Sequence, residues 1–63
     1  MSLAANPAPT PQVLVVDDDE ALRASIADYL GQHGYGVHVA SDALTMDKVL
    51  AAEPIDLIVL DVM

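Results

Sequence analysis

The chain has 63 residues, which limits it to one small domain or to part of one. It has no cysteine and a formal net charge of −8, so disulfides and thiolate metal sites are excluded, and direct nucleic-acid binding is disfavoured because phosphate contacts need Lys and Arg. Hydrophobic residues make up 54% of the sequence, too many for a disordered chain, yet no apolar run approaches the roughly 20 residues that span a membrane.

Residues 1–12 carry three prolines among small residues and show no hydrophobic periodicity. This composition predicts a disordered leader. It has neither the basic start nor the apolar core of a secretory signal, which together with the missing cysteines favours a cytoplasmic location. We expect the folded part to begin at residue 13.

Residues 13–16 are all apolar, three of them are β-branched, and four acids follow from Asp17 to Glu20. A short continuous apolar run is typical of a strand buried on both faces. Ligands of parallel α/β sheets bind at the carboxyl ends of the strands. The acids are therefore expected at the edge of the sheet that is used for binding.

The next segment, residues 20–32, has the periodicity of an amphipathic helix. Its apolar residues recur four positions apart, at Leu22, Ile26 and Leu30. Asp19 is placed to cap the first turn, and Gly34 supplies the left-handed residue that ends the helix. Arg23 follows the acidic run closely, but the sequence does not decide whether it contacts the acids.

Residues 36–40 alternate between more and less apolar side chains, which favours a second strand at an edge of the sheet. His38 in this strand has no partner at metal-ligand spacing and is expected to face solvent. A second helix is predicted over residues 43–52, capped by Ser41 or Asp42. Pro54 ends it, because the residue before a proline disfavours the α conformation.

A third strand is predicted over residues 55–60, in which the apolar run 57–60 again stops on a carboxylate, Asp61. The order strand, helix, strand, helix, strand predicts an α/β fold with a doubly wound parallel sheet and right-handed crossovers. The first and third strands are the most hydrophobic and belong inside, whereas the second belongs at an edge. The predicted strand order is 2-1-3, with the topological switch point between strands one and three.

The acids at the two strand ends suggest a metal site. Neighbouring strands lie about 4.8 Å apart, so Asp18 and Asp61 could approach within about 5 Å and repel by about 3 kcal/mol at an effective dielectric near 20. A set of oxygen ligands suits Mg²⁺ or Mn²⁺, which would neutralise an incoming phosphoryl group while one Asp attacks it. The alternative is that residues 17–20 only cap the helix and Asp61 is a solvated strand end.

Residues 13–20 resemble the opening of a bacterial response-regulator receiver domain, which has a CheY-like (flavodoxin-like) fold. Residues 57–63 resemble the phosphorylation strand of that family, and the segments between them agree in order and spacing. The resemblance covers about residues 12–63. The second helix and residues 61–63 are similar to the OmpR-like branch of the family.

The resemblance implies a role for each acid at the strand ends. Asp61 would be the phospho-acceptor, taking its phosphoryl group from the phosphohistidine of a sensor histidine kinase. Asp18 would bind Mg²⁺ directly, Asp17 would hold it through water, and Met63 would contribute its backbone carbonyl. Such a domain is a phosphorylation switch and not a turnover enzyme. It acts on an output domain, here one expected to regulate transcription by binding DNA. A second copy of the domain, forming a homodimer, is a further possible partner.

The resemblance also implies parts that these 63 residues do not show. A receiver continues through two more strands and three more helices, which supply a Ser or Thr and a Lys for the phosphoryl group. Lys48 lies in the second predicted helix and cannot take the role of that Lys. We therefore expect residues 13–63 to be the N-terminal part of a receiver domain, truncated after the third strand, whose hydrophobic edge would be left bare.

Two other functions fit parts of the sequence. A Mg²⁺-dependent phosphohydrolase of the haloacid-dehalogenase type also begins with an apolar strand that ends in acids, which Asp17 and Asp19 could supply. Against it, Glu20 and Ala21 replace the small hydroxyl-bearing residues of such a loop, and Asp61 would have no role. The third reading is an interaction module that keeps the fold and is not phosphorylated.

Overall fold

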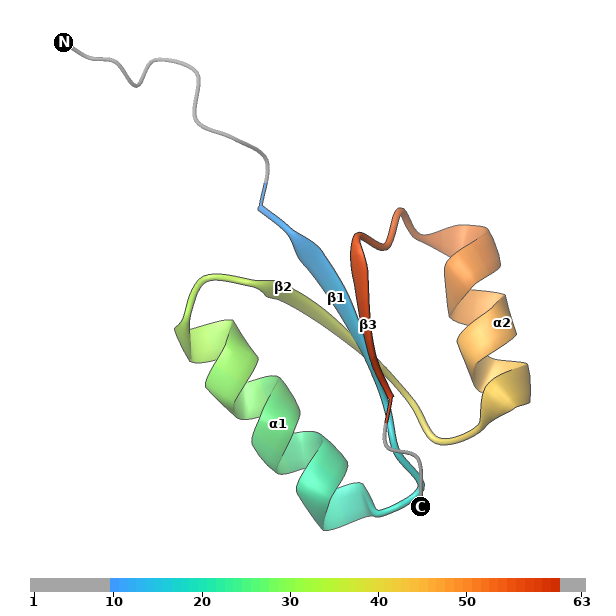
Figure 1. Ribbon diagram of the computed structural model, residues 1–63, viewed down its shortest axis with the longest axis horizontal. Helices are drawn as coiled ribbons and strands as arrows, with labels where there is room; N and C mark the ends of the chain where they lie inside the picture. The colour runs from blue at the N-terminus through green and yellow to red at the C-terminus, as the bar shows by residue number, and fades with distance from the viewer. Residues whose placement is uncertain (1–9, 61–63) are drawn as a thin grey trace, which may run out of the picture.

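The computed structural model describes residues 10–60. These residues form β1 (Gln12–Val16), α1 (Glu20–Gln32), β2 (Gly36–Ala40), α2 (Ala43–Ala52) and β3 (Leu57–Leu60). The strands make one parallel sheet in the order β2-β1-β3, and the two helices lie on opposite sides of it (Figure 1). The predicted doubly wound α/β fold and its strand order are confirmed.

The ends of two strands differ from the prediction. β1 begins at Gln12, one residue early, because Gln12 pairs in parallel register with Gly36. β3 begins at Leu57, two residues late, and Asp56 still belongs to the connection between α2 and β3. The backbone amide of Asp56 donates to the Gln12 carbonyl at 2.8 Å, and the Asp56 carboxylate accepts from the Gln12 amide at 2.8 Å.

Both helices begin at an aspartate that caps the first turn. Asp19 accepts a hydrogen bond from the amide of Leu22 at 3.1 Å, and Asp42 accepts one from the amide of Thr45 at 2.8 Å. These bonds satisfy amides that have no partner within the helix. Gly34 follows α1 with a φ of 88°, the left-handed conformation that was predicted.

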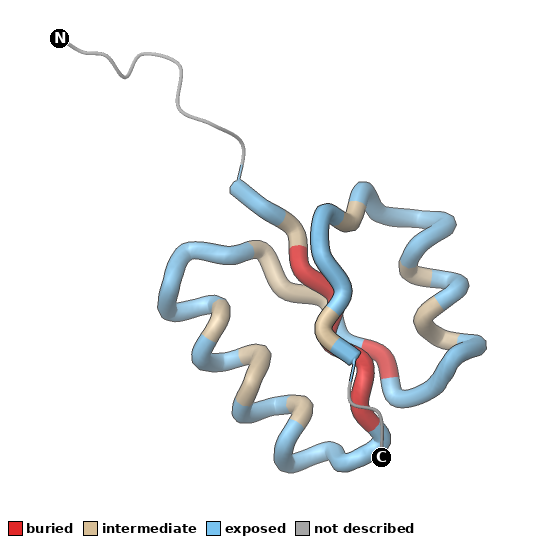
Figure 2. Tube along the Cα trace, in the orientation of Figure 1, coloured by how far each residue is buried: buried red, intermediate tan, exposed pale blue. Residues whose placement is uncertain are grey.

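The core is centred on β1, which is buried along residues 13–16 (Figure 2). Leu14 is fully buried, and it forms the core cluster together with Val16 of β1 and Ala40 of β2. Met46, Val49 and Ile55 pack against this cluster from the α2 side of the sheet. Burying a leucine side chain contributes about 1.5–3 kcal/mol, so the central strand supplies much of the packing energy.

The third strand was expected inside on its hydrophobicity, which is wrong for the described residues, but its exposure agrees with the bare hydrophobic edge expected of a truncated domain. Leu57 is 57% exposed and Leu60 is 54% exposed. Neither helix packs closely on β3, and no strand among residues 10–60 lies beyond it in the sheet. A groove of about 230 Å³ therefore stays open between α1 and β3; Leu22, Ile26, Val59 and Leu60 line it.

The helices are short. α1 has 13 residues and α2 has 10, whereas crossing a bilayer takes about 20 apolar residues. Within residues 10–60, neither helix has the length and apolar character of a membrane span.

Candidate functional site

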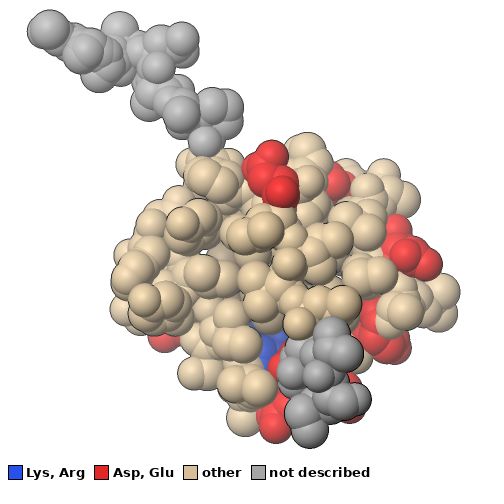
Figure 3. Space-filling view, in the orientation of Figure 1, with Lys and Arg blue, Asp and Glu red and all other residues tan. Residues whose placement is uncertain are grey.

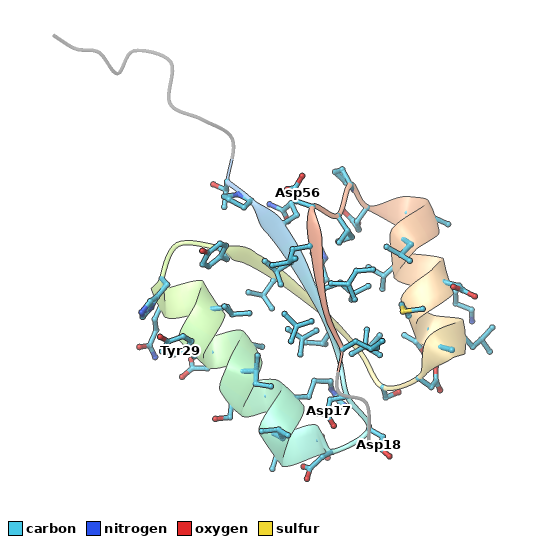
Figure 4. All side chains as sticks on the ribbon, in the orientation of Figure 1. Asp17, Asp18, Tyr29 and Asp56 are labelled. Carbon is cyan, nitrogen blue, oxygen red and sulfur yellow. The ribbon has the colours of Figure 1, made fainter. Side chains whose placement is uncertain are left out.

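The acidic run lies where β1 ends and α1 begins. Val16 pairs with Leu60 in the parallel register, so β1 and β3 end at the same edge of the sheet. Asp17 and Asp18 lie at this edge, close to the first turn of α1 (Figure 4). β2 and β3 flank β1 on either side, which makes this edge the predicted topological switch point.

Asp17 is held more tightly than its neighbours. It is only 4% exposed, and its amide donates to the Ala40 carbonyl at 3.1 Å. Its carboxylate Oδ1 accepts from the amide of Asp19 at 2.8 Å, and its carbonyl accepts from Arg23 Nη1 at 2.8 Å. The second carboxylate oxygen, Oδ2, is buried and has no hydrogen-bond partner among residues 10–60.

A buried carboxylate oxygen without a partner is costly. Leaving a buried polar group unsatisfied costs about 1–3 kcal/mol, and more for a charged group. The guanidinium of Arg23 does not remove this cost, because it donates to the Asp17 carbonyl and not to the carboxylate. A hard divalent cation whose bound water donates to Oδ2 would do so, and the oxygen donors of this edge fit such an ion.

The other acids of the run are exposed and have different roles. Asp19 uses its carboxylate to cap α1, which confirms its prediction as a cap. Asp18 lies beside Asp17 with its side chain in solvent (Figure 4). Acidic side chains are visible at this end of the molecule beside a small patch of basic atoms, and others are spread over the same face (Figure 3).

Two predicted ligands, Asp61 and Met63, lie outside the described residues. Within residues 10–60, no three His, Cys, Asp or Glu side chains come together as a group that could hold a metal. Asp17 and Asp18 are the two predicted ligands that the structure describes. Asp61 follows Leu60 directly in the chain, and Leu60 is the register partner of Val16.

A polar network at the other end of β1 was not predicted. His38 Nε2 lies 2.8 Å from Gln12 Oε1, so the expectation of a solvent-facing His38 was wrong. Gln12 Nε2 donates to the Thr10 carbonyl at 3.2 Å, so the Gln12 side chain links His38 to the backbone just before β1. Only the strand register, which places Gln12 opposite Gly36, could have indicated this contact.

Comparison with known proteins supports a specific family. The family model described as "Response regulator receiver domain" matches residues 13–63. The regulatory protein VirG of Agrobacterium fabrum is 40% identical over 53 residues, covering 84% of this chain and 21% of VirG. The transcriptional regulatory protein AruR of Pseudomonas aeruginosa is 40% identical over 57 residues (82% and 23%), and the response regulator MprA of Mycobacterium avium is 42% identical over 52 residues (82% and 23%). The chain thus spans about a fifth of the length of these relatives, and no solved structure matches significantly.

The fold and the family match together define the class of protein. A parallel sheet with helices on both sides and a buried acid at the end of its central strand is the arrangement of a CheY-like α/β domain. The family match is more specific: the chain belongs to the response regulator receiver domain family, a family of signalling domains in two-component systems.

The phosphohydrolase alternative loses support on two grounds. It needs the carboxylates of both Asp17 and Asp19 for chemistry, but Asp19 Oδ1 is already bonded to the first turn of α1. The family match and the named relatives also belong to response regulators.

Proposed function

We propose that this domain is a phosphorylation switch whose acceptor is Asp61. A carboxylate oxygen of Asp61 attacks the phosphorus of a phosphohistidine on a sensor histidine kinase; the P–N bond breaks and the imidazole nitrogen keeps the electron pair. The main support is the buried Oδ2 of Asp17 at the end of β1, which has no hydrogen-bond partner within the described residues 10–60. Further support is that Leu60 is the register partner of Val16 and that Asp61 follows Leu60 directly in the chain.

The proposed site includes Mg²⁺ or Mn²⁺. Asp17, Asp18, Asp61 and the backbone carbonyl of Met63 would hold the ion, with Asp18 bound directly and Asp17 through water. When bound, the ion would neutralise charge on the phosphoryl group. The chain's own contribution is to keep the Asp17 carboxylate buried and fixed, so that little has to be ordered when a cation arrives.

The proposed output lies outside this segment. Phosphorylation adds about −1.5 to −2 charge at Asp61, enough to bias a two-state surface that an output domain or a second copy reads. AruR is named a transcriptional regulatory protein, and by analogy we propose a DNA-binding output domain that controls transcription. The segment itself, at net charge −8, is not proposed to touch DNA. A cytoplasmic location belongs to the same proposal and rests on the family alone.

Phosphate incorporation tests the acceptor. The intact protein is incubated with phosphoramidate, a small phosphohistidine analogue, with Mg²⁺ or with excess chelator. We expect Mg²⁺-dependent incorporation that is lost in Asp61→Asn and retained in Asp47→Asn, which removes an exposed acid from α2. Unchanged incorporation in Asp61→Asn would show that the acceptor is another residue. If the protein binds no Mg²⁺ at millimolar concentration, the reading as an unphosphorylated interaction module is favoured.

A further inference from the structure

Arg23 makes a contact that neither the fold nor the acidic run requires. It is one of only two basic residues in the chain, and it is partly buried in α1. Its Nη1 donates to the backbone carbonyl of Asp17, six residues earlier, at 2.8 Å. The other basic residue, Lys48, is exposed on α2, on the opposite side of the sheet (Figure 1).

The bond from Arg23 is the third of three hydrogen bonds that hold Asp17 in place. The amide of Asp17 is bonded to β2 through Ala40, its Oδ1 is bonded to the amide of Asp19, and its carbonyl is bonded to Arg23. The main chain on both sides of the residue and one carboxylate oxygen are thereby restrained. Oδ2 is left buried and, among residues 10–60, without a partner.

We propose that Arg23 is a positioning residue for the cation site. Its guanidinium does not touch the ion; it holds the Asp17 carbonyl from the adjacent helix, so that the Asp17 carboxylate is preset for a divalent cation. The inference rests on the proposed function, because it takes Asp17 as part of the metal site. It adds a residue of α1 to a site otherwise built from strand ends.

Removing Arg23 has two opposite effects on cation binding. Loss of the hydrogen bond frees the Asp17 main chain and weakens binding, whereas loss of a positive charge near the acids strengthens it. Solvent and salt screen the charge of the partly buried guanidinium over the distance to the cation. They do not screen its short-range hydrogen bond to the Asp17 carbonyl. The first effect therefore dominates at physiological ionic strength, and the net result is weaker binding.

Mn²⁺ binding to the intact protein tests whether removal of Arg23 weakens or strengthens cation binding. Free Mn²⁺ is counted by electron paramagnetic resonance for the wild type, Arg23→Ala, Arg23→Lys and Lys48→Ala. A lost charge-assisted hydrogen bond corresponds to about a tenfold higher Kd for Arg23→Ala. Arg23→Lys keeps the charge and one donor, so it should recover part of the affinity. Lys48→Ala changes the net charge by the same amount but leaves Asp17 alone, so its Kd should stay at the wild-type value.

A second measurement needs no metal. Amide hydrogen exchange in the metal-free protein follows the amide of Asp19, which donates to the Asp17 carboxylate. We expect about tenfold faster exchange of this amide in Arg23→Ala, with exchange of the Leu14 amide in the core unchanged. Faster exchange at both amides would mean that Arg23 only stabilises the whole fold, and the inference would fall.

The outcomes separate this inference from the proposed function. Normal Mn²⁺ binding by the wild type with equal or tighter binding by Arg23→Ala overturns the positioning role and leaves the proposed function standing. Absence of Mn²⁺ binding by the wild type at millimolar concentration overturns the metal site, and the inference with it. Weaker binding by Arg23→Ala alone, partly restored by Arg23→Lys, supports both.

Discussion

Val16 of β1 and Leu60 of β3 are register partners at the end of the parallel sheet. Asp17 follows the first of these residues and Asp61 follows the second. Asp17 is buried with one carboxylate oxygen unpartnered among residues 10–60. This register is the structural basis of our proposal that the acids of two distant segments form one site.

The unpaired charge of Asp17 predicts a stability effect of the opposite sign with and without metal. Asp17→Asn keeps the size of the side chain and removes the charge, so the metal-free protein should gain about 1–2 kcal/mol in its free energy of unfolding. Added Mg²⁺ should stabilise the wild type and not the variant, because a ligand stabilises only the state that binds it. Urea denaturation with and without Mg²⁺ measures both effects. Asp47→Asn is the control, and a loss of metal-free stability in Asp17→Asn would contradict the account.

Because the central strand is buried, a cavity made in it should strongly lower the free energy of unfolding. Leu14 is fully buried between the two helical layers, so Leu14→Ala should lower the free energy of unfolding by about 2–5 kcal/mol. Leu44 is 67% exposed on α2, and Leu44→Ala should change it by less than about 0.5 kcal/mol. Chemical denaturation of the two variants compares them directly. Similar values would place the core elsewhere.

The close approach of the Gln12 side chain to Gly36 allows a test of the Gln12–His38 contact. A Cβ at Gly36 would overlap the side-chain amide of Gln12, which is bonded to His38. Gly36→Ala should therefore displace the Gln12 side chain and cost about 0.5–1.5 kcal/mol, the usual net value of a hydrogen bond. In Gln12→Ala the same substitution should cost much less, because its neighbour is gone. Additive effects in this double-mutant cycle would argue against the contact.

The cap of α2 predicts a dependence on pH. The backbone amide of Thr45 donates to Asp42 and, with a smaller effect of Lys48, holds the pKa of the Asp42 carboxyl below its ordinary value. A lowered folded-state pKa means that the stabilisation is present above the ordinary aspartate pKa of about 3.9 and is lost as the pH falls through the lower value. Asn caps helices as well as Asp does but does not titrate, so Asp42→Asn should show a smaller loss of stability on acidification. Denaturant midpoints between about pH 2.5 and 6 measure the difference, and identical pH profiles would refute it.

Much of the fold follows from local pattern. The apolar run of residues 13–16 predicted the buried central strand, and two aspartates at helix starts predicted where both helices begin. Two features of the site did not follow. Which of Asp17 and Asp18 is buried depends on how the chain leaves the sheet, and the bond from Arg23 to a carbonyl six residues earlier depends on where α1 lies against β1. The hydrophobicity of β3 alone indicated a buried strand, and its exposure was expected only from the truncation that the family resemblance implies, because composition gives the hydrophobicity of a strand and not the elements that cover it.

The central claim is that Asp61 receives the phosphoryl group at an edge formed with Asp17. An aspartyl phosphate is an acyl phosphate, which borohydride reduces to homoserine. After the intact protein has been phosphorylated in Mg²⁺ and reduced, mass spectrometry of its peptides identifies the modified position. The account predicts homoserine at position 61 and at no other aspartate. Homoserine at position 17, 18 or 19, or none at all under conditions in which phosphate is incorporated, would contradict it.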